Sequence, residues 1–581
     1  MANLPFPWRA EDLPSNAFWF RSGVDGWDFG AQRKTSSGWD ADKESPNNPV
    51  ENQDRVCYGM PVYAIADGEV ISSWRNAPEN PRPGEKHPGR LATPKTITLS
   101  GNHVAVLGGD GSVILYAHMT TGSVPAELCP FNDEFITDAD DKVTPAGAPH
   151  ANVPRETMLP AGNRPRVRRG QFLGRVGNSG NSTGPHLHMD RDDADGSVQR
   201  FTQDRAWMSD KSDPDDWKPF TGQTVGANDK SVVILASPLL RRGDAGAGGF
   251  GELAMHFVRS RRVVTALQDE DGNLKLITWG MTPPEQIQRR GDISAGRASR
   301  IAIAEPRSDI VVTALRDGDG NLRLISWRVE NNGDITRCAD AVAGPVNRVA
   351  LATSQEGVVV SAVRTDGGNL KLIAWSVASD GAITRRGDAD AGAIGDVAIT
   401  RAGPFGGVVT AVRTGSGKLK LIAWQVSGNG ATISRRGDAD AGTVSDVSMI
   451  SRGGQGQFLL TALRDSEGEL RLVSWRLSGE GSIERLGTAT AGKIAEVDVA
   501  GVASAELSAA VACRDNDGRL RLMTWELSSD GRTITRWGGA LAGTAARINI
   551  AGASDAGRAF FVTSCADSDG KLKLIHWEAN L

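Results

Sequence analysis

From about residue 230 onward, the chain repeats one pattern of apolar and polar positions. Each repeat has two runs that are apolar at most positions, such as 311–315 and 322–327, joined by an Asp- and Gly-rich turn such as 317–320. Apolar runs of this length are typical of strands buried on both faces, and such turns are typical of hairpins. Two more polar runs, such as 383–386 and 396–400, complete a unit of four predicted strands.

The third predicted strand of every unit ends in tryptophan, and successive tryptophans are 48, 48, 49, 51, 50 and 52 residues apart. A four-stranded unit with a period near 50 residues is typical of a β-propeller blade. Seven units therefore predict a seven-bladed propeller. The seven residues are Trp279, Trp327, Trp375, Trp424, Trp475, Trp525 and Trp577.

The two ends of this region predict how the propeller closes. Residues 239–244 match the last strand of a unit, whereas the sequence ends soon after Trp577 without that strand. We expect residues 238–244 to complete the last blade, because such a closure leaves no open sheet edge. The predicted propeller covers 238–581, after a linker at 226–237.

Two motifs within the repeat have structural interpretations. Arg-Gly-Asp recurs at one place in the unit, which favours a structural turn over an adhesion signal. The turn at Asp317-Gly318-Asp319-Gly320 favours a hairpin over a calcium loop, because it lacks the closing glutamate of such loops. The repeat carries no catalytic set, so we expect a binding platform. The tripeptides are 242–244, 290–292, 386–388 and 436–438.

The first 225 residues have short strand-like runs and a concentration of histidines. His186 and His188 lie two apart in Gly-Pro-His-Leu-His, so on a strand they face the same side. Two converging imidazoles suit a zinc ion with a general acid or base beside it. The preceding segments are Gly-Met-Pro-Val-Tyr-Ala-Ile-Ala-Asp-Gly-Glu-Val at 59–70, Tyr-Ala-His at 116–118 and Gly-Gln-Phe-Leu-Gly-Arg-Val-Gly at 170–177.

In this order and spacing, the four segments resemble those of the lysostaphin-type (LytM-like) zinc endopeptidases, which cut peptide cross-links in bacterial cell walls. The resemblance covers roughly residues 20 to 200. It implies a β-sheet peptidase domain over 1–225, one zinc ion as cofactor and peptidoglycan as the substrate. Together with the propeller, it predicts an all-β protein of two domains.

The first zinc-binding motif of that family, His-x-Gly-x-Asp, is incomplete here. Asp28 is the favoured ligand, in which case Val24 stands where the family has histidine. In the other register Asp25 is the ligand and Arg21 takes the place of histidine. Asp25 is a candidate third ligand if the backbone turns at Gly26, and His87, His103 and His150 are further candidates.

The resemblance assigns the remaining roles. His188 is implied as a zinc ligand, and His118 and His186 as catalytic groups that do not bind the ion. Tyr116 precedes His118 by two positions and would orient a ligand or pack beside it. Asn181 and Ser182 are candidate hydrogen-bond donors to the substrate. The predicted substrate-binding residues are therefore Tyr116, Asn181 and Ser182.

Polar insertions at 31–58, 76–95 and about 121–165 interrupt this domain, and we expect them to wall the substrate groove. Residues 192–229 are polar and predict a domain tail and linker. Cys57 and Cys129 are a candidate pair. Buried thiols are expected at Cys338, Cys513 and Cys565.

Composition limits the possible partners. The chain has 65 basic and 70 acidic residues, with a net charge of −5, which offers no broad basic surface for nucleic acid. No apolar run approaches the roughly 18 residues of a membrane span. The sequence shows no signal peptide, so delivery outside the cytoplasm is expected by another route or after trimming.

Three functions are consistent with these patterns. The first is an active zinc endopeptidase acting on peptidoglycan, with a propeller that binds the wall or a carrier. The second is an inactive peptidase-like domain that binds wall peptide or a partner. The third is a surface protein whose domains bind glycan or protein.

Overall fold

The computed structural model forms two compact units, Met1–Pro238 with Asn580, and Leu239–Ala579 with Leu581. Both units are built from strands, so the fold class is all-β. The residues that the structure describes are 7, 12–13, 17–22, 26–197, 206–211, 213–220, 232–235, 237–258, 261–282, 286–555 and 558–581.

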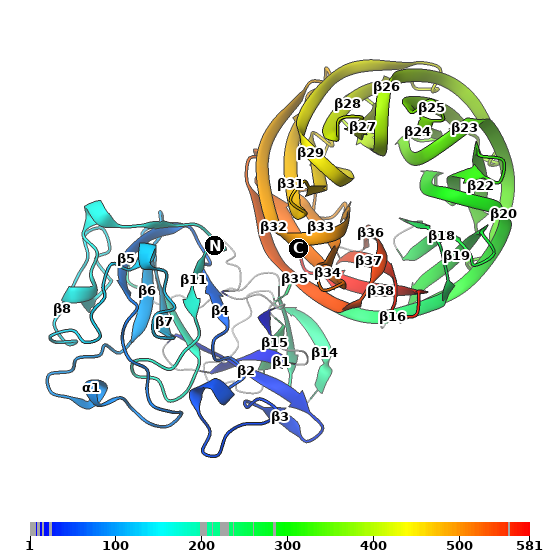
Figure 1. Ribbon diagram of the computed structural model, residues 1–581. Helices are drawn as coiled ribbons and strands as arrows, with labels where there is room; N and C mark the ends of the chain where they lie inside the picture. Colours follow the sequence, from blue (N-terminus) through cyan, green and yellow to red (C-terminus); the bar gives the residue numbers. More distant parts are fainter. Residues whose placement is uncertain are drawn as a thin grey trace. The chain divides into compact units, whose positions relative to one another are not determined.

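Within the described residues, the first unit is organised on one sheet of eleven strands in the order β10-β5-β6-β7-β12-β2-β1-β15-β13-β14, with β3 paired to β2 (Figure 1). The strands are β1 (Ala17–Ser22), β2 (Trp27–Thr35), β3 (Gly38–Asp40), β4 (Pro61–Tyr63), β5 (Gly68–Trp74), β6 (Asn102–Leu107), β7 (Val113–Met119), β8 (Lys142–Val143), β9 (Val153–Pro154), β10 (Arg166–Val167), β11 (Phe172–Arg175), β12 (Leu187–Asp192), β13 (Ala206–Asp210), β14 (Asp213–Phe220) and β15 (Val232–Leu235). The short helix α1 covers Pro88–Leu91, and single 3₁₀ turns cover Asn52–Asp54, Ala126–Leu128, Arg155–Thr157 and Ala161–Asn163.

The central strands of this sheet alternate between core and groove. In β2, Trp27 and Phe29 are buried and Asp28 between them is partly exposed. In β12, Leu187 and Met189 are buried, and His188, Asp190 and Asp192 face the groove on the other side. Successive side chains of a strand point to opposite faces, so the buried residues fix the direction of the polar ones.

Two predictions for the first unit are wrong in the described residues. Part of the predicted tail and linker forms strands: β15 pairs with β1 and β13, and its Val233 and Ile234 are buried in the sheet. Its apolar, mostly β-branched run explains this preference. Cys57 and Cys129 do not pair. Both are free, and the Cys57 thiol donates to the carbonyl of Pro185 at 3.0 Å.

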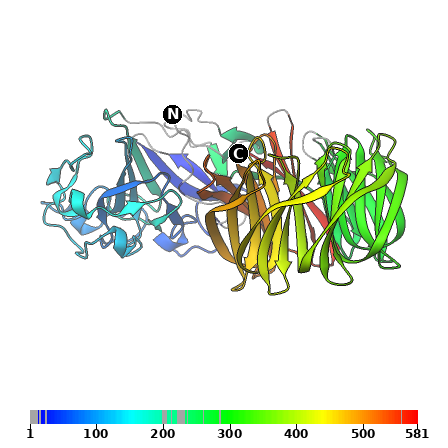
Figure 2. The ribbon, with the colours of Figure 1, turned by 90° about the horizontal axis from the view of Figure 1, so that it is seen from above.

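The second unit is a closed ring of seven four-stranded antiparallel sheets in the described part of the chain, and Figure 2 shows this ring edge-on. Each long strand ends one blade and begins the next, as β20 does between β19 and β21. The strands are β16 (Leu239–Gly249), β17 (Leu253–Phe257), β18 (Arg262–Gln268), β19 (Asn273–Thr282), β20 (Gln286–Arg307), β21 (Ile310–Asp317), β22 (Asn321–Val329), β23 (Ile335–Gln355), β24 (Val358–Thr365), β25 (Asn369–Val377), β26 (Ile383–Ala402), β27 (Gly407–Thr414), β28 (Lys418–Val426), β29 (Ile433–Arg452), β30 (Phe458–Asp465), β31 (Glu469–Leu477), β32 (Ile483–Gly501), β33 (Ser508–Asp515), β34 (Arg519–Leu527), β35 (Ile534–Thr544), β36 (Ala546–Asp555), β37 (Arg558–Ala566) and β38 (Lys571–Ala579).

The ring closes through its first strand. β16 pairs antiparallel with β38, so the strand that opens the repeat region completes the last blade together with β36 and β37. This is the closure that the repeat predicts. It is reinforced by a buried ion pair between Arg242 of β16 and Glu578 of β38, with the closest atoms 2.6 Å apart.

The repeated tryptophans are the cores of the blades. Each is nearly inaccessible to solvent, and in six blades its indole N–H donates to a hydroxyl fourteen residues earlier on the neighbouring strand, as Trp327 does to Thr313 at 3.0 Å. The sixth blade has Val511 at that position, and the Trp525 indole nitrogen is buried without a hydrogen-bond partner.

The tripeptides and the Asp-rich turn take defined places. Arg-Gly-Asp lies within the last strand of a blade, at a bulge in strand pairing, and not in a turn as the sequence predicts. At the hairpin, Asp317 accepts hydrogen bonds from the backbone of Asp319 and Asn321. Those bonds are the ones that close a hairpin turn.

Candidate functional site

Asp28 and His188 lie directly opposite each other on the paired strands β2 and β12. The Asp28 Oδ1 and His188 Nδ1 atoms are 2.6 Å apart, and the same carboxylate oxygen is 3.4 Å from His186 Nε2. His186 comes just before β12 and stays on the same side as His188, as the spacing of two residues predicts. Residues 160 positions apart in sequence thus form one cluster.

His118 joins this cluster from the end of β7. Its backbone has a φ of 66°, in the left-handed region that non-glycine residues rarely adopt. Its ring centroid is 4.7 Å from that of His186 and 5.6 Å from that of His188. Backbone conformations of this kind concentrate at functional sites, where the surrounding structure supports their cost.

The Gly-rich loop before His186 is anchored from the polar insertions. The Asn80 side-chain amide donates to the carbonyls of Gly180 and Ser182 at 3.1 and 3.0 Å, and Glu79 accepts from the Asn178 backbone at 2.7 Å. Asn52, from the first insertion, accepts from the side chain of Asn178 at 2.8 Å. These insertions therefore hold the loop in place.

Hydrogen bonds fix the proton positions on two histidines. His118 Nδ1 donates to the Ser179 carbonyl at 2.8 Å, and His186 Nδ1 donates to the Gly184 carbonyl at 2.8 Å. A carbonyl oxygen only accepts, so each Nδ1 carries a proton. Burial, together with the charges of His186 and His188, lowers the pKa of His118 well below 6.5. His118 is therefore neutral, and its Nε2 is available to accept a proton.

His188 is in the opposite electrostatic situation. Burial lowers its pKa, but hydrogen bonds to Asp190 and Asp28 outweigh this and raise the pKa to about 10. Burial alone would raise the pKa of Asp28. The hydrogen bonds from His186 and His188 have the larger combined effect and hold the pKa of Asp28 well below its usual range. Without a metal ion, His188 is an imidazolium that donates to a carboxylate from each ring nitrogen.

The donor atoms fit a zinc ion. One nitrogen from each of His118, His186 and His188 lies within 4.8 Å of the others, and Asp28 adds a carboxylate oxygen. Asp28 and His188, whose Oδ1 and Nδ1 atoms are 2.6 Å apart, would hold such an ion. Because His188 Nδ1 donates to Asp28, His188 would have to lose this proton to serve as a metal ligand.

Asp190 is a further member of the cluster, and the sequence analysis missed it. Its carboxylate accepts from His188 Nε2 at 3.0 Å, on the ring edge away from Asp28. A carboxylate in this place orients a metal-ligating histidine and makes it more basic. The signal was present in the sequence, because Asp190 follows His188 by two positions on the same face of the strand.

The cluster lies in an open groove of about 720 Å³. The sheet face with the histidines forms its floor, and residues 98–100 and 150–154, with Asn181 and Thr183, lie along its sides. The third insertion thus contributes to the wall, as the sequence predicts. Asn181 is exposed and lines the groove, in keeping with a contact to the substrate.

Two of the predicted substrate-binding residues do not face the groove. Tyr116 is fully buried in the core, where its hydroxyl accepts from the Ile65 backbone at 2.9 Å. The irregular backbone at His118 explains why residues two apart do not share a face here. Ser182 is also buried, and its hydroxyl donates to the Gly184 carbonyl at 2.7 Å, so it shapes the turn before His186.

The other candidate ligands lie apart from the cluster or outside the described residues. His87 Nδ1 accepts from the Gly89 backbone at the start of α1. His103 is buried and bonded to Ser72, and His150 is bonded to the Ala194 carbonyl. Asp25 and Val24 lie outside the described residues, as does the side chain of Arg21.

No protein-family model and no curated protein matches this sequence. Solved structures match with low identity. A protein from Lactobacillus plantarum is 14% identical with a TM-score of 0.37, over 59% of this chain and 97% of its own. A periplasmic gluconolactonase from Pseudomonas aeruginosa is 11% identical with a TM-score of 0.39, over 62% and 93%. The lectin SapL1, solved with α-methyl fucoside, is 14% identical with a TM-score of 0.35, over 52% and 97%. These likenesses say nothing about activity.

A separate finding concerns membranes. In the described residues, no helix has the length and apolar character needed to cross a bilayer.

Proposed function

We propose that the first unit is a zinc-dependent endopeptidase that cleaves peptide bonds in bacterial peptidoglycan. The convergence of Asp28, His118, His186 and His188 in an open groove carries this proposal. The four ordered sequence motifs support the choice of substrate, because the family that they resemble cuts wall cross-links. Such a substrate places the site of action outside the cytoplasm.

The roles follow from the contacts of each side chain. Asp28 and His188 would hold the zinc ion, which supplies a Lewis acid able to lower the pKa of water to about 7. His118 is neutral with a free Nε2, so it is suited to accept a proton from that water. His186, held by Gly184 through Nδ1, faces the same point and is suited to stabilise the oxyanion or protonate the leaving amine.

A second candidate function is a peptidase-like module that binds wall peptide without cutting it. Two observations favour it: valine or arginine replaces the first histidine of the family motif, and His188 is already paired with two carboxylates. A site that lacks one protein ligand binds zinc more weakly, and the Asp28–His188 bond competes with the ion.

Zinc content and wall cleavage distinguish the two functions. The endopeptidase predicts about one zinc per chain and chelator-sensitive release of peptides from purified peptidoglycan. His188→Ala should abolish both. His150→Ala is the matched control, since His150 lines the groove outside the cluster. Absence of zinc and cleavage, with gain of both in Val24→His, would establish the binding module instead.

We infer that the propeller serves as a binding platform. Within the described residues, the group of metal-ligating side chains that can share one ion lies in the first unit, at His118, His186 and His188. A glycan or a protein is the expected ligand of the propeller. Pull-down with intact cell walls, using the chain with and without residues 239–581, tests whether this unit carries the wall affinity.

A further inference from the structure

The gaps between successive propeller blades contain a pocket that recurs with the repeat. One pocket, of about 370 Å³, lies between β20 and the next blade, and another of about 310 Å³ lies one repeat further on. Corresponding residues are 48 positions apart: Gly296 and Gly344, Ile325 and Ile373, Arg337 and Arg385. The pocket is therefore a property of the repeat and not of one loop.

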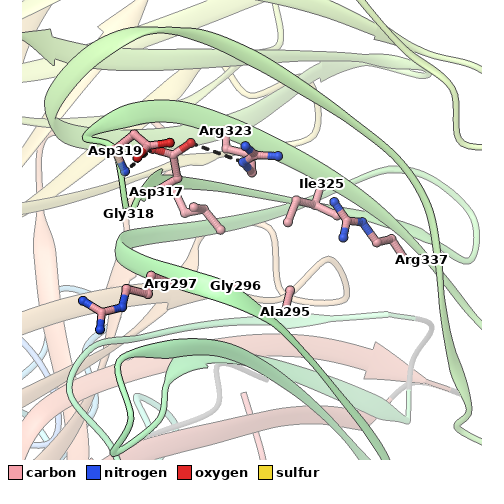
Figure 3. Close-up of a pocket in the computed structure, with 10 residues that line it drawn as sticks. Ala295, Gly296, Arg297, Asp317, Gly318, Asp319, Arg323, Ile325 and Arg337 are labelled. Atoms are coloured by element: carbon pink, nitrogen blue, oxygen red, sulfur yellow. Dashed lines mark hydrogen bonds and ion pairs between the residues drawn. The ribbon is translucent and has the colours of Figure 1, made fainter.

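One wall of this pocket is formed by an Ala-Gly pair on the strand that leaves the preceding blade. In Figure 3, Ala295 and Gly296 lie across the pocket from Ile325 and Arg323. A Cβ atom at Gly296 would meet no other atom within 4 Å, and its φ lies outside the left-handed region. Neither packing nor backbone conformation therefore requires glycine here.

The same holds at the equivalent glycine of five other repeats. In each, the space beside the backbone is empty and φ is not positive. Neither packing nor backbone conformation explains why glycine recurs at this position. A recurring glycine of this kind leaves space for a ligand to approach the backbone. The six residues are Gly248, Gly296, Gly344, Gly392, Gly442 and Gly543.

The facing wall carries a balanced set of charges. Arg323 Nη1 donates to Asp340 at 2.7 Å, and Arg337 Nη2 donates to the other oxygen of that carboxylate at 3.0 Å. Lys371, Arg385 and Asp388 form the same triad in the next blade, at 2.8 and 3.2 Å. Arg297, Arg323 and Arg337 line the first pocket together with Asp317 and Asp319, and Asp340 behind them pairs with two of the arginines, so the charges of this group balance.

This chemistry selects a class of ligand. Guanidinium groups donate and carboxylates accept, which suits vicinal hydroxyl groups. The partly exposed Ala295, beside the buried Leu315 and Ile325, gives the pocket an apolar lining for C–H groups. A neutral pocket gives no electrostatic advantage to an anion or a cation, and its volume lies at the small end of ligand pockets. A neutral sugar ring meets all these conditions.

We propose that the clefts between blades bind neutral saccharide units of a glycan, and that the propeller is thereby a multivalent glycan-binding unit. Five clefts have the complete triad of two basic residues and one aspartate. In the fifth and sixth blades, Thr488 and Gly539 occupy the position of the aspartate, so the triad is incomplete. The five aspartates are Asp244, Asp292, Asp340, Asp388 and Asp438. This proposal goes beyond the endopeptidase and does not depend on zinc.

The test is calorimetric titration of the full chain with N-acetylglucosamine, galactose, mannose and fucose, and with glucuronic acid and glucosamine as charged comparisons. We expect a neutral sugar to bind at about five sites per chain. A surface coated with that sugar should bind the chain at least about 100-fold more tightly, through multivalency. Failure of every neutral sugar, or preference for a charged one, would overturn the proposal.

Filling the clefts provides the second arm. Gly248, Gly296, Gly344, Gly392 and Gly543 face the five triads, and changing all five to valine should weaken binding at least tenfold without lowering Tm. Gly428→Val with Gly479→Val is the matched control, because these glycines also have open space but lie outside the clefts. Unchanged binding by the folded five-site variant would refute the proposal.

If the five-site variant melts at a lower temperature, sugar binding is measured instead on a variant with Asp340→Asn, Asp388→Asn and Asp438→Asn. A loss of about three of five sites with an intact fold supports the proposal, and retention of all sites refutes it. Zinc content and peptide release are measured on the same samples. They report on the endopeptidase alone, so failure of one proposal is distinguishable from failure of the other.

Discussion

His188 shows how neighbouring residues decide the chemistry of a side chain. It lies between Asp28 and Asp190, which hold it as an imidazolium, whereas His118, buried a few ångströms away, is neutral. Two imidazoles of one cluster therefore have opposite protonation states at neutral pH. This difference suits one to hold a metal ion after losing its proton, and the other to accept a proton.

Asp190→Asn tests the role of the second carboxylate. Loss of its charge should lower the pKa of His188 from about 10, because burial then acts against only one carboxylate. Zinc affinity should fall by roughly 10- to 100-fold, as for other partners of metal-ligating histidines. An NMR titration of the imidazole and a zinc titration measure the two effects. Asp195→Asn, a change outside the groove, is the control, and an unchanged pKa of His188 in Asp190→Asn would contradict this role.

His103 gives the first unit a pH-dependent stability. Burial lowers its pKa to about 4 in the folded protein, below the 6.5 of the unfolded chain. Between these values the unfolded chain binds more protons, so the stability present above pH 6.5 is lost as the pH falls to 4. The loss should reach about 3 kcal/mol at about 1.4 kcal/mol per pH unit.

Denaturant unfolding of the first unit at several pH values measures this contribution. His103→Gln should reduce the slope between pH 4 and 6.5, to which the buried His118 also contributes, whereas His150→Gln, on an exposed residue, should leave the slope unchanged. Equal slopes in wild type and His103→Gln would show that another group governs the acid sensitivity.

Within a blade, the tryptophan of the third strand is tied to the second strand by one hydrogen bond. Six of the seven blades make this bond. The blade that contains Trp525 does not, because Val511 stands where the other blades have a serine or threonine. A buried donor without a partner costs about 1–3 kcal/mol. The sixth blade is therefore a weak element of an otherwise regular ring.

Val511→Thr should stabilise the propeller by about 0.5–1.5 kcal/mol, because the new hydroxyl accepts from Trp525. The reverse change in another blade, Thr313→Val, should destabilise it by about 1–3 kcal/mol by leaving the Trp327 indole without a partner. Thermal and denaturant unfolding measure both. A destabilised Val511→Thr would show that the sixth blade has no room for the hydroxyl.

The propeller as a whole depends on its closing strand. β16 joins β38, and the Arg242–Glu578 pair is buried at this junction, with Glu578 only 2% exposed. Arg558 Nε also lies 3.5 Å from Glu578, so loss of Arg242 would leave this buried carboxylate with one partner in place of two. The closure of the ring therefore depends in part on a polar contact between its first and last strands.

Arg242→Ala should lower the unfolding free energy of the propeller by about 1–3 kcal/mol, because Glu578 keeps Arg558 as a partner, and should loosen the pairing of β16 with the β38 edge. Arg290→Ala changes the equivalent arginine of another blade, which is exposed, and should have an effect within about 0.5 kcal/mol. Chemical denaturation and light scattering measure stability and association. Equal stability of the two variants would mean that the ion pair does not secure the closure.

The sequence by itself determined the propeller, because each blade is built from neighbouring strands whose apolar runs, hairpin turns and tryptophans recur every 48 to 52 residues. Even the closure followed from local pattern, since 239–244 supplies the strand that the last unit lacks. The spacing of His186 and His188 likewise placed both on one face. In these cases the relevant interactions are close in sequence or repeated along it.

The tertiary structure decided what depends on distant or irregular backbone. Tyr116 and Ser182 turned inward because the chain departs from regular strand geometry at His118 and in the Gly-rich loop. Strand β15 pairs with β1 on one side and β13 on the other. The sequence analysis predicted a linker there because the residues around this short apolar run are polar. The clefts between blades are defined only in three dimensions, since the space that residues share is set by residues far apart in the chain.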